Sequence, residues 1–172
     1  MSDTETSEIK FSAGEIVLYR RYGVCRVSST EERTFGDSQK LYYTLEPVFV
    51  AKTTKFYVPA DADGLDLLIR RIFDEKQLTA AVNCAKDEPL QWIDSAKERL
   101  ASFEELMKTG TLADMVRLAR ALREHKLRQK KLGRHFIDCD RRILAAAEKL
   151  ASDELVYVLG IDRDEAFDRI YD

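Results

Sequence analysis

The first third of the chain alternates between apolar and polar residues with the period of β-strands. The alternating segments are rich in β-branched and aromatic residues, which suit a pleated, half-buried surface. They cover residues 15–20, 23–28, 41–45, 48–50 and 55–58. Gly23 marks a short connection, and Phe35-Gly-Asp-Ser38 has the composition of a turn. Short antiparallel strands over roughly sixty residues predict a small β-barrel or a strongly bent antiparallel sheet.

From residue 74 onward the apolar residues recur at helical spacing. Asp74 with Gln77, and Thr111 with Asp114, have the spacing of helix N-terminal capping pairs. The predicted helices follow Asp74, run from Trp92 to Met107, follow Thr111, extend from a cap at Asp138 or Asp140 to Leu159, and run from Asp162 to Ile170. Pro89, Gly110, Gly133 and Gly160 separate them.

The two periods predict an α+β chain, in which a small β half is followed by a compact all-α half of about five helices. We expect a disordered N-terminal tail over residues 1–10, a β domain over residues 11–65 and a helical domain over residues 66–172. Composition agrees with this assignment: 45% of the residues are apolar, enough for a core, and the 7 glycines and 3 prolines are few for an all-β protein.

The net charge of the chain is −3, which excludes a protein held on DNA by bulk positive charge. The charge is segregated, however. Residues 117–134 hold eight basic residues and one acid, a net charge of +7, whereas residues 148–172 carry a net charge of −5. Two interpretations stand side by side: a basic face that contacts phosphates, or a solvated helix face that pairs with the acidic C-terminal segment.

Trp92 is the only tryptophan of the chain and lies just after Pro89. A lone tryptophan commonly anchors a core, here between the two halves. An exposed indole ring would instead stack on DNA bases or wedge between them.

An enzyme is not expected. The two histidines, His125 and His135, lie in or beside the basic segment with no catalytic motif around them. The three cysteines are far apart and form no CxxC pair, so neither a metal site nor a disulfide is expected, and no cofactor is expected either. No segment has the apolar length of a membrane span or a signal peptide. We therefore expect a cytoplasmic monomer with its thiols reduced.

Several motifs resemble one protein family. Residues 11–27 read FSAGEIVLYRRYGVCRV, and they resemble the opening F-x-x-G-[DE]-x-V-[VL]-[YH]-x-x-[YH]-G-x-[AG] of the CarD family, the CdnL-like transcriptional regulators. Further similar segments are Glu32-Arg33-Thr34, Tyr57-Val58-Pro59, Gln91-Trp92, residues 142–150 and residues 159–167. The resemblance covers nearly the whole chain, in both halves and in the right order.

The resemblance implies that the β half is a Tudor-like domain that binds the β subunit of bacterial RNA polymerase, related to a module of transcription-repair coupling factor. Arg33, in the first long loop, would contact the polymerase beside Phe35. Tyr57 would lie on the same face, and Lys55 would supply a charge. For Tyr57, a role in packing the sheet is an equal alternative.

The resemblance also implies that the helical half holds promoter DNA and stabilises the open promoter complex. Trp92 would wedge into the minor groove at the upstream edge of the transcription bubble. Lys97 and Arg99, on the same helix as Trp92, would reach phosphates. A second basic cluster comprises Lys130 and Lys131 in the break before the long helix, Arg134, and Arg141 and Arg142 in the first turns of that helix.

One departure from the family supports a second hypothesis. Many relatives have basic residues directly after the tryptophan, whereas Asp94 stands here two residues after Trp92 and would repel phosphate. The alternative is therefore a polymerase-binding module with little direct DNA contact. Both hypotheses imply a protein associated with the nucleoid through RNA polymerase.

Overall fold

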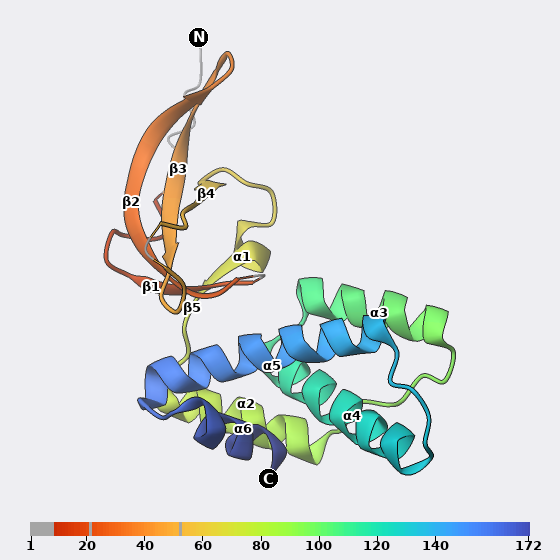
Figure 1. Cartoon of the computed structure of the whole chain (residues 1–172). Helices are drawn as coiled ribbons and strands as arrows, with labels where there is room; N and C mark the ends of the chain where they lie inside the picture. Colours follow the sequence, from red (N-terminus) through yellow and green to blue (C-terminus); the bar gives the residue numbers. More distant parts are fainter. Residues whose placement is uncertain (1–8, 21, 52) are drawn as a thin grey trace. The chain divides into compact units, whose positions relative to one another are not determined.

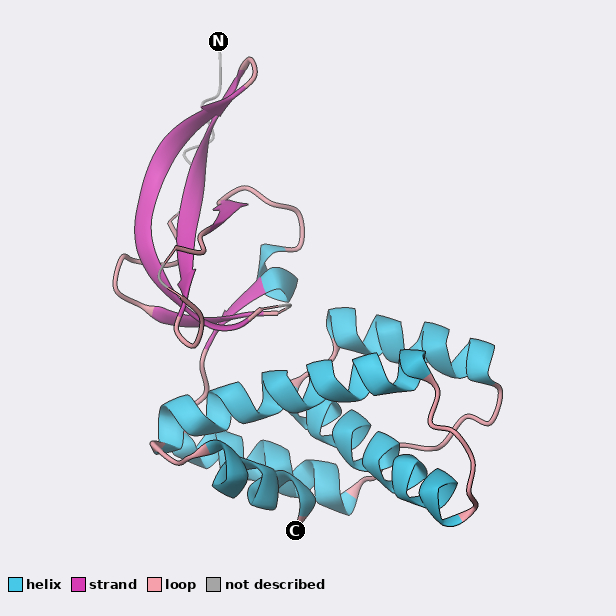
Figure 2. Cartoon of the chain, in the orientation of Figure 1, coloured by secondary structure: helices cyan, strands magenta, loops and turns pink. Residues whose placement is uncertain are grey.

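The computed structural model describes residues 9–20, 22–51 and 53–172, and it divides the chain into two compact units, Met1–Ile72 and Phe73–Asp172 (Figure 1). The N-terminal unit is an antiparallel sheet with one short helix, and the C-terminal unit is all-α (Figure 2). The predicted α+β class is confirmed.

The N-terminal unit is built on a five-stranded antiparallel sheet with the strand order β4-β3-β2-β1-β5. Its strands are β1 (Ile16–Tyr19), β2 (Gly23–Phe35), β3 (Ser38–Pro47), β4 (Phe56–Pro59) and β5 (Ile69–Arg71). The register of β2 against β3 shifts between Val27 and Ser29, and such a bulge bends a strand and increases its twist. One face of the sheet buries an apolar core that includes Val17, Tyr43 and Leu45.

The β2–β3 hairpin is longer than the alternation predicted. Both strands extend to the turn at Gly36, whose φ of 63° is the left-handed conformation that glycine adopts without strain. The strand predicted over residues 48–50 is wrong, because β3 ends at Pro47 and the next residues form a bend in which Phe49 and Val50 are exposed. The apolar residue types of this segment suggested a strand. Among the described residues, however, β3 and its ladder end at Pro47, and the Val48 amide donates to the Val24 carbonyl oxygen at 3.0 Å.

The boundary between the units lies between Ile72 and Phe73, not between residues 65 and 66 as predicted. Residues 65–71 form α1 (Leu65–Leu68) and β5, and β5 completes the sheet by pairing with β1. The side chain of Ile69 is buried in the N-terminal core. A three-residue edge strand has too short an alternation to be recognised in sequence.

The expected disordered tail covers residues 1–10, of which residues 1–8 lie outside the described part. Lys10 has defined contacts: its backbone amide donates to the Tyr43 hydroxyl at 2.9 Å, and its ammonium pairs with Asp66 at 3.2 Å.

The C-terminal unit consists of α2 (Glu75–Asp87), α3 (Ala96–Thr109), α4 (Leu112–Lys131), α5 (Asp138–Leu159) and α6 (Arg163–Tyr171). The two capping boxes predicted from sequence, at Asp74 and Thr111, are confirmed. α5 differs from the prediction, because neither candidate aspartate caps it: its N-cap is Ile137, which makes no side-chain capping bond.

The long helices α4 and α5 pack on each other, with α2 against α4 and α6 against α5. Their contact faces form one continuous core, whose largest fully buried members include Phe103, Leu118, Leu122, Leu155 and Ile170. α5 also buries acidic groups. Glu154 accepts a hydrogen bond from the Phe73 amide at 2.8 Å, which ties the start of this unit to its central helix.

Candidate functional site

The β2–β3–β4 register brings the predicted polymerase-contacting residues onto one face of the sheet. Side chains alternate between the two faces of a strand, so Arg33 and Phe35 lie on the same face of β2. Cross-strand pairs share a face as well, and Tyr57 of β4 lies opposite Thr44 of β3, which pairs with Ser29 of β2. This outer face is opposite to the one that buries Tyr43 and Leu45.

Arg33 is the centre of this outer face. Its guanidinium pairs with Glu31 at 2.6 Å and lies over the Tyr57 ring, 4.1 Å from the ring centroid. Hydrogen bonding to Glu31 raises the pKa of Arg33, and the same guanidinium lowers the pKa of the Glu31 carboxyl. Arg33 is therefore a permanent cation held in a fixed orientation above an aromatic ring.

Aromatic surface surrounds this cation. Phe35 is 53% exposed and makes an edge contact with the Tyr42 ring at 5.1 Å. Tyr57 is 40% exposed, so it is not a buried packing residue, although it supports Arg33. Lys55 pairs with Glu46 at 3.2 Å.

The prediction that Arg33 lies in a loop is wrong, since it lies within β2. The strand holds its side chain more rigidly than a loop would.

Trp92 lies in the segment between α2 and α3, and not on α3, which begins after its N-cap Ser95. The indole is half-buried against the helical core. It stacks on the His125 ring of α4, with centroids 4.2 Å apart and planes inclined by 25°, and meets the edge of Phe103 at 6.1 Å. These contacts hold one part of the ring and leave another part in solvent.

Arg99 was predicted to contact DNA, but the structure places it inside the protein, 4% exposed. Its guanidinium donates to both carboxylate oxygens of the buried Asp140, at 3.2 and 2.8 Å, and to the carbonyl oxygens of Ile93 and Asp94, at 2.8 and 3.0 Å. It also lies 4.6 Å from the centroid of the Trp92 ring. Arg99 is thus a support for Trp92 and is excluded from phosphate contact by its burial.

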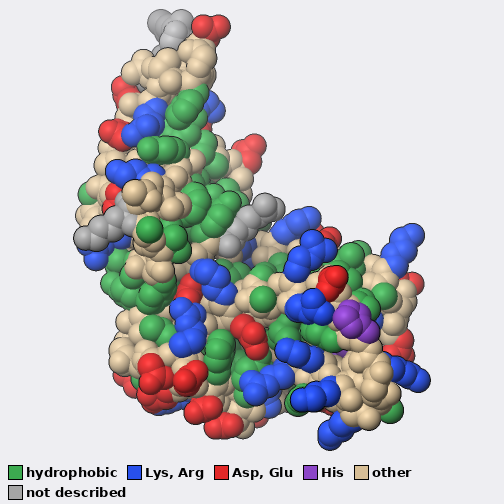
Figure 3. Space-filling view, viewed as in Figure 1, with side chains coloured by type: hydrophobic (Ala, Val, Ile, Leu, Met, Phe, Trp, Pro, Cys, Tyr) green, Lys and Arg blue, Asp and Glu red, His purple; other side chains and the backbone are tan. Residues whose placement is uncertain are grey.

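The other predicted DNA-contacting cations are exposed. Lys97 is in the first turn of α3, and Arg134 is in the loop between α4 and α5. Arg141 and Arg142 are at the start of α5. Lys130 and Lys131 are the last residues of α4, so the prediction that they lie in the break after this helix is wrong. Arg141 pairs with Asp138 at 2.6 Å, with both side chains more than half exposed. Figure 3 shows Lys and Arg side chains spread over one face of the helical unit, with histidine among them.

The stack on α4 brings Trp92 close to the basic end of this helix. His125 precedes Lys130 by five residues, an axial rise of about 7.5 Å. His125 also lies 6.1 Å from the ring of Phe136, in the loop that carries Arg134. An aromatic row of Trp92, His125 and Phe136 therefore borders the basic cluster.

Other residues of the basic segment have internal partners. Arg117 pairs with Asp114 at 2.9 Å and with Glu88 at 3.2 Å. Arg120 donates to the Ile170 carbonyl oxygen at 2.7 Å. These contacts hold α2 and α6 against α4, so part of the +7 charge has a structural role.

His125 is the residue that sequence reasoning undervalued, as a phosphate neighbour or a surface residue. Leu118, Leu122 and His125 follow one another at helical spacing on α4, and this signal places the histidine on the apolar face. Its Nδ1 atom is buried without a hydrogen-bond partner among the described residues.

Burial lowers the pKa of His125, and the nearby cations Arg99 and Arg128 lower it further, against the weaker opposing effects of Asp140 and Asp94. Between the lowered pKa and the ordinary value of about 6.5, the unfolded chain binds the proton and the folded chain does not. The stability of the helical unit is therefore expected to be complete above about pH 6.5 and to fall as the pH drops below it.

Urea unfolding followed by Trp92 fluorescence at pH 7.5 and 5.5 measures this loss, which His125→Gln should reduce. His135→Gln, on the exposed loop, is the control and should leave the difference as in the wild type. An equal pH dependence in His125→Gln would contradict the assignment.

No group of three or more His, Cys, Asp or Glu side chains with metal-binding geometry occurs in the described part of the chain. Within the same residues, no helix has both the length and the apolar character needed to cross a bilayer.

Comparison with protein families adds one match. Residues 11–73 match the CarD-like/TRCF RID domain over the whole described sheet and its flanking segments. The N-terminal unit is thus similar to the CarD-like/TRCF RID domain. This family comprises RNA polymerase-interacting domains, which are protein-interaction domains and not catalytic ones. No curated protein matches the chain significantly.

The match ends at residue 73, where the second unit begins. The match therefore concerns the N-terminal unit alone, whereas the helical unit is characterised by its own geometry.

Proposed function

We propose that this chain binds the β subunit of RNA polymerase through the outer face of its RID domain and stabilises the open promoter complex through its helical unit. The observation that carries the proposal is the presence, in one chain, of an RID domain and of a half-exposed indole beside a basic cluster. The first provides attachment to polymerase, and the second has the chemistry that holds separated DNA strands apart.

The polymerase half of the proposal is supported by the composition of the outer face. Binding hot spots are enriched in arginine, tyrosine and other large side chains that are pre-positioned and become desolvated on binding. Arg33 is held by Glu31 and by the Tyr57 ring, so little side-chain entropy is lost when it binds. Phe35 and Tyr57 add exposed aromatic surface on the same face.

The DNA half of the proposal rests on differential binding. A contact available only where base pairs are open stabilises the melted state and not the closed one. The exposed part of Trp92 would wedge at the upstream edge of the bubble in the minor groove. Lys97, Lys130, Lys131 and Arg134 would hold the flanking phosphates, which fixes position without reading sequence.

The charge distribution favours binding to polymerase first and contact with DNA afterwards. With a net charge of −3 the chain has low affinity for free DNA, whereas its segment at +7 favours DNA once the polymerase delivers it. Selectivity would come from the bubble and from polymerase.

The alternative function, a polymerase-binding module with little DNA contact, is supported by two observations. Asp94 is exposed two residues from Trp92, and Arg99 is buried and does not offset it on the surface. Salt separates the two functions: each phosphate contact adds about 0.9 to the slope of log affinity against log salt, so a DNA-contacting factor loses its effect steeply and a protein platform does not.

Arg33→Glu is expected to weaken binding of the polymerase β subunit about thirtyfold, the effect of losing a hot-spot residue worth about 2 kcal/mol. The new carboxylate would be repelled by Glu31, and the cation over the Tyr57 ring would be lost. Surface plasmon resonance with immobilised β subunit measures the change.

Lys108→Glu is the matched control, because it makes the same charge change at an exposed position on α3. The affinity of Lys108→Glu for the β subunit should equal that of the wild type. The affinity of Arg33→Lys should lie between those of the wild type and Arg33→Glu. Wild-type affinity in Arg33→Glu would show that polymerase docks elsewhere.

A further inference from the structure

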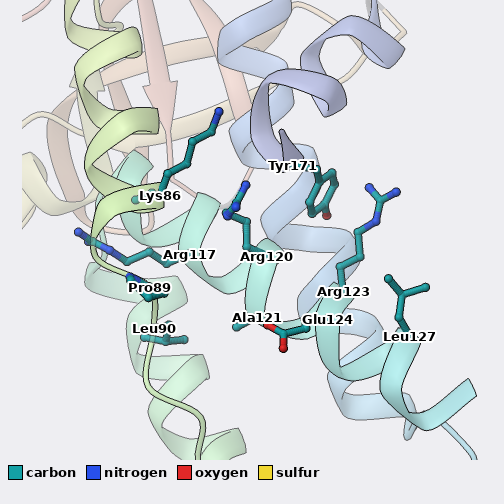
Figure 4. A pocket seen from close by; sticks show the side chains of 11 residues that line it. Lys86, Pro89, Leu90, Arg117, Arg120, Ala121, Arg123, Glu124, Leu127 and Tyr171 are labelled. Atoms are coloured by element: carbon teal, nitrogen blue, oxygen red, sulfur yellow. The ribbon is translucent and has the colours of Figure 1, made fainter. Parts of the chain in front are cut away.

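A cavity of about 480 Å³ opens on the helical unit among α2, α4 and α6 (Figure 4), and its lining does not include Trp92 or His125. The walls come from the C-terminal end of α2 and the following segment, from the middle of α4, and from Tyr171 at the end of α6. Its volume lies within the range of about 300–1,000 Å³ typical of small-molecule sites.

The cavity has two chemically different ends. At one end lie the cationic groups: Figure 4 shows Arg120 and Arg123 on either side of the Tyr171 ring, and Lys86 farther from it on α2. At the other end lie the apolar side chains of Leu90 and Leu127. Such a cavity suits a ligand with an anionic group at one end and an apolar or planar group at the other.

The positive charge at the cationic end is not fully compensated. The guanidinium of Arg123 lies over the Tyr171 ring at 3.9 Å from its centroid, and among the described residues no carboxylate pairs with Arg123 or with Lys86. Arg120 donates to the neutral Ile170 carbonyl oxygen. Glu124, the one acidic residue of the lining, pairs with Arg128 at 3.0 Å.

Tyr171 is a fixed wall of this site. Its hydroxyl donates to Glu148 of α5, and burial together with this bond raises the pKa of Tyr171, so the phenol stays neutral. The ring is thus held by its hydroxyl and orients the Arg123 guanidinium. A guanidinium presented in this way binds phosphate oxygens in a bidentate manner.

We propose that this cavity binds a free nucleoside phosphate. The phosphates would lie between Lys86, Arg120 and Arg123, and the planar base would lie against Leu90 and Leu127. A concave site of this volume encloses a mononucleotide, whereas duplex phosphates are contacted by protruding cations such as those at the end of α4. The site goes beyond the proposed transcriptional role and does not depend on it.

Isothermal titration of the full chain with ATP, in the absence of polymerase and DNA, tests the proposal. ATP should bind, and both adenosine and inorganic phosphate should bind at least about tenfold more weakly, because each satisfies one end of the cavity. Lys86→Gln and Arg123→Gln should each weaken ATP binding about tenfold, since each removes a charge-assisted contact.

Lys76→Gln is the matched control, because Lys76 is exposed on the same helix as Lys86 and lies outside this cavity. It should bind ATP as the wild type does. Unchanged ATP binding in Lys86→Gln and Arg123→Gln would overturn the proposal, as would the absence of ATP binding.

A single-stranded pentanucleotide distinguishes a free nucleotide from a nucleic acid. If the pentanucleotide bound in a manner dependent on Lys86 and Arg123 while ATP did not, this surface would be part of the DNA interface and the proposal would be wrong. Failure of ATP to bind would leave the polymerase and open-complex tests unaffected, because those use Arg33 and Trp92.

Discussion

Replacing Asp140 with alanine is expected to lower the free energy of unfolding of the helical unit by about 3–5 kcal/mol, the cost of leaving a buried charge without its partner. The side chains of Arg99 and Asp140 are only 5% and 1% exposed, and they form a two-bond pair that joins α3 to α5. Without Asp140 the guanidinium stays buried with only carbonyl acceptors. Since small domains are stable by about 5–15 kcal/mol, this loss is a large part of the total.

Urea unfolding followed by fluorescence measures this loss selectively, because the single tryptophan of the chain, Trp92, lies in the helical unit. Asp138→Ala is the control on the same helix. It removes an exposed Arg–Asp pair, in which Arg141 bonds to Asp138 through one contact at 2.6 Å and the two side chains are 53% and 75% exposed. Exposed pairs contribute about 0–1 kcal/mol, so the two variants should differ severalfold, and equal effects would contradict the structural role of Arg99.

The Asp140 variant also tests how Trp92 is positioned. Arg99 contacts the indole and the carbonyls of the two following residues, so its release should broaden the Trp92 emission in the still-folded protein. The double variant Arg99→Met with Asp140→Leu should lower the free energy of unfolding by less than the sum of the two single changes, because no buried charge is then left unpaired.

Replacing Trp92 with alanine is expected to shorten the lifetime of the open promoter complex about 5- to 150-fold. The estimate follows from the value of about 1–3 kcal/mol for stacking of one base on an aromatic side chain. The effect should appear in the lifetime of the melted complex and not in polymerase affinity, because Trp92 belongs to the unit outside the RID match. Competitor challenge of preformed complexes with purified polymerase measures it.

Two further variants separate loss of the wedge from loss of folding. Trp92→Phe retains a ring that can stack on His125 and should recover part of the lifetime. Lys130→Gln with Lys131→Gln leaves the packing of the exposed α4 end unchanged and should shorten the lifetime while reducing its salt dependence by about one to two in slope. A wild-type lifetime in a folded Trp92→Ala protein would rule out the wedge and favour the alternative function.

Local signals predicted much of the helical unit correctly. Asp74 with Gln77, and Thr111 with Asp114, marked two helix starts through contacts between residues three apart, and Gly160, with φ of 65°, closes α5 as expected. In each case the deciding interactions lie within a few residues along the chain. Asp140 shows the limit of such signals, since the same residue types that cap a helix also form buried ion pairs.

The resemblance predicted which residues form the outer face of the N-terminal unit, and the strand register placed them together on that face. Arg33 and Tyr57 belong to segments that resemble the family, and Phe35 was expected beside Arg33, whereas their common face follows from the pairing of β2 with β3 and of β3 with β4. β5 was missed because its partner, β1, lies some fifty residues earlier, with Leu18 opposite Arg70. Pairing over such a separation leaves no periodic signal within a three-residue strand.

By itself, the sequence determined the α+β class, the order of the two halves, most helix ends and the segregation of charge, because periodicity, capping and net charge are local properties. Tertiary structure alone decided which charged side chains are exposed and can contact a partner. Arg99 and Lys97 are two residues apart on α3, yet Asp140, forty-one residues from Arg99, buries one, while the other remains exposed. Burial depends on what packs against a side chain, and only the folded chain brings those partners together.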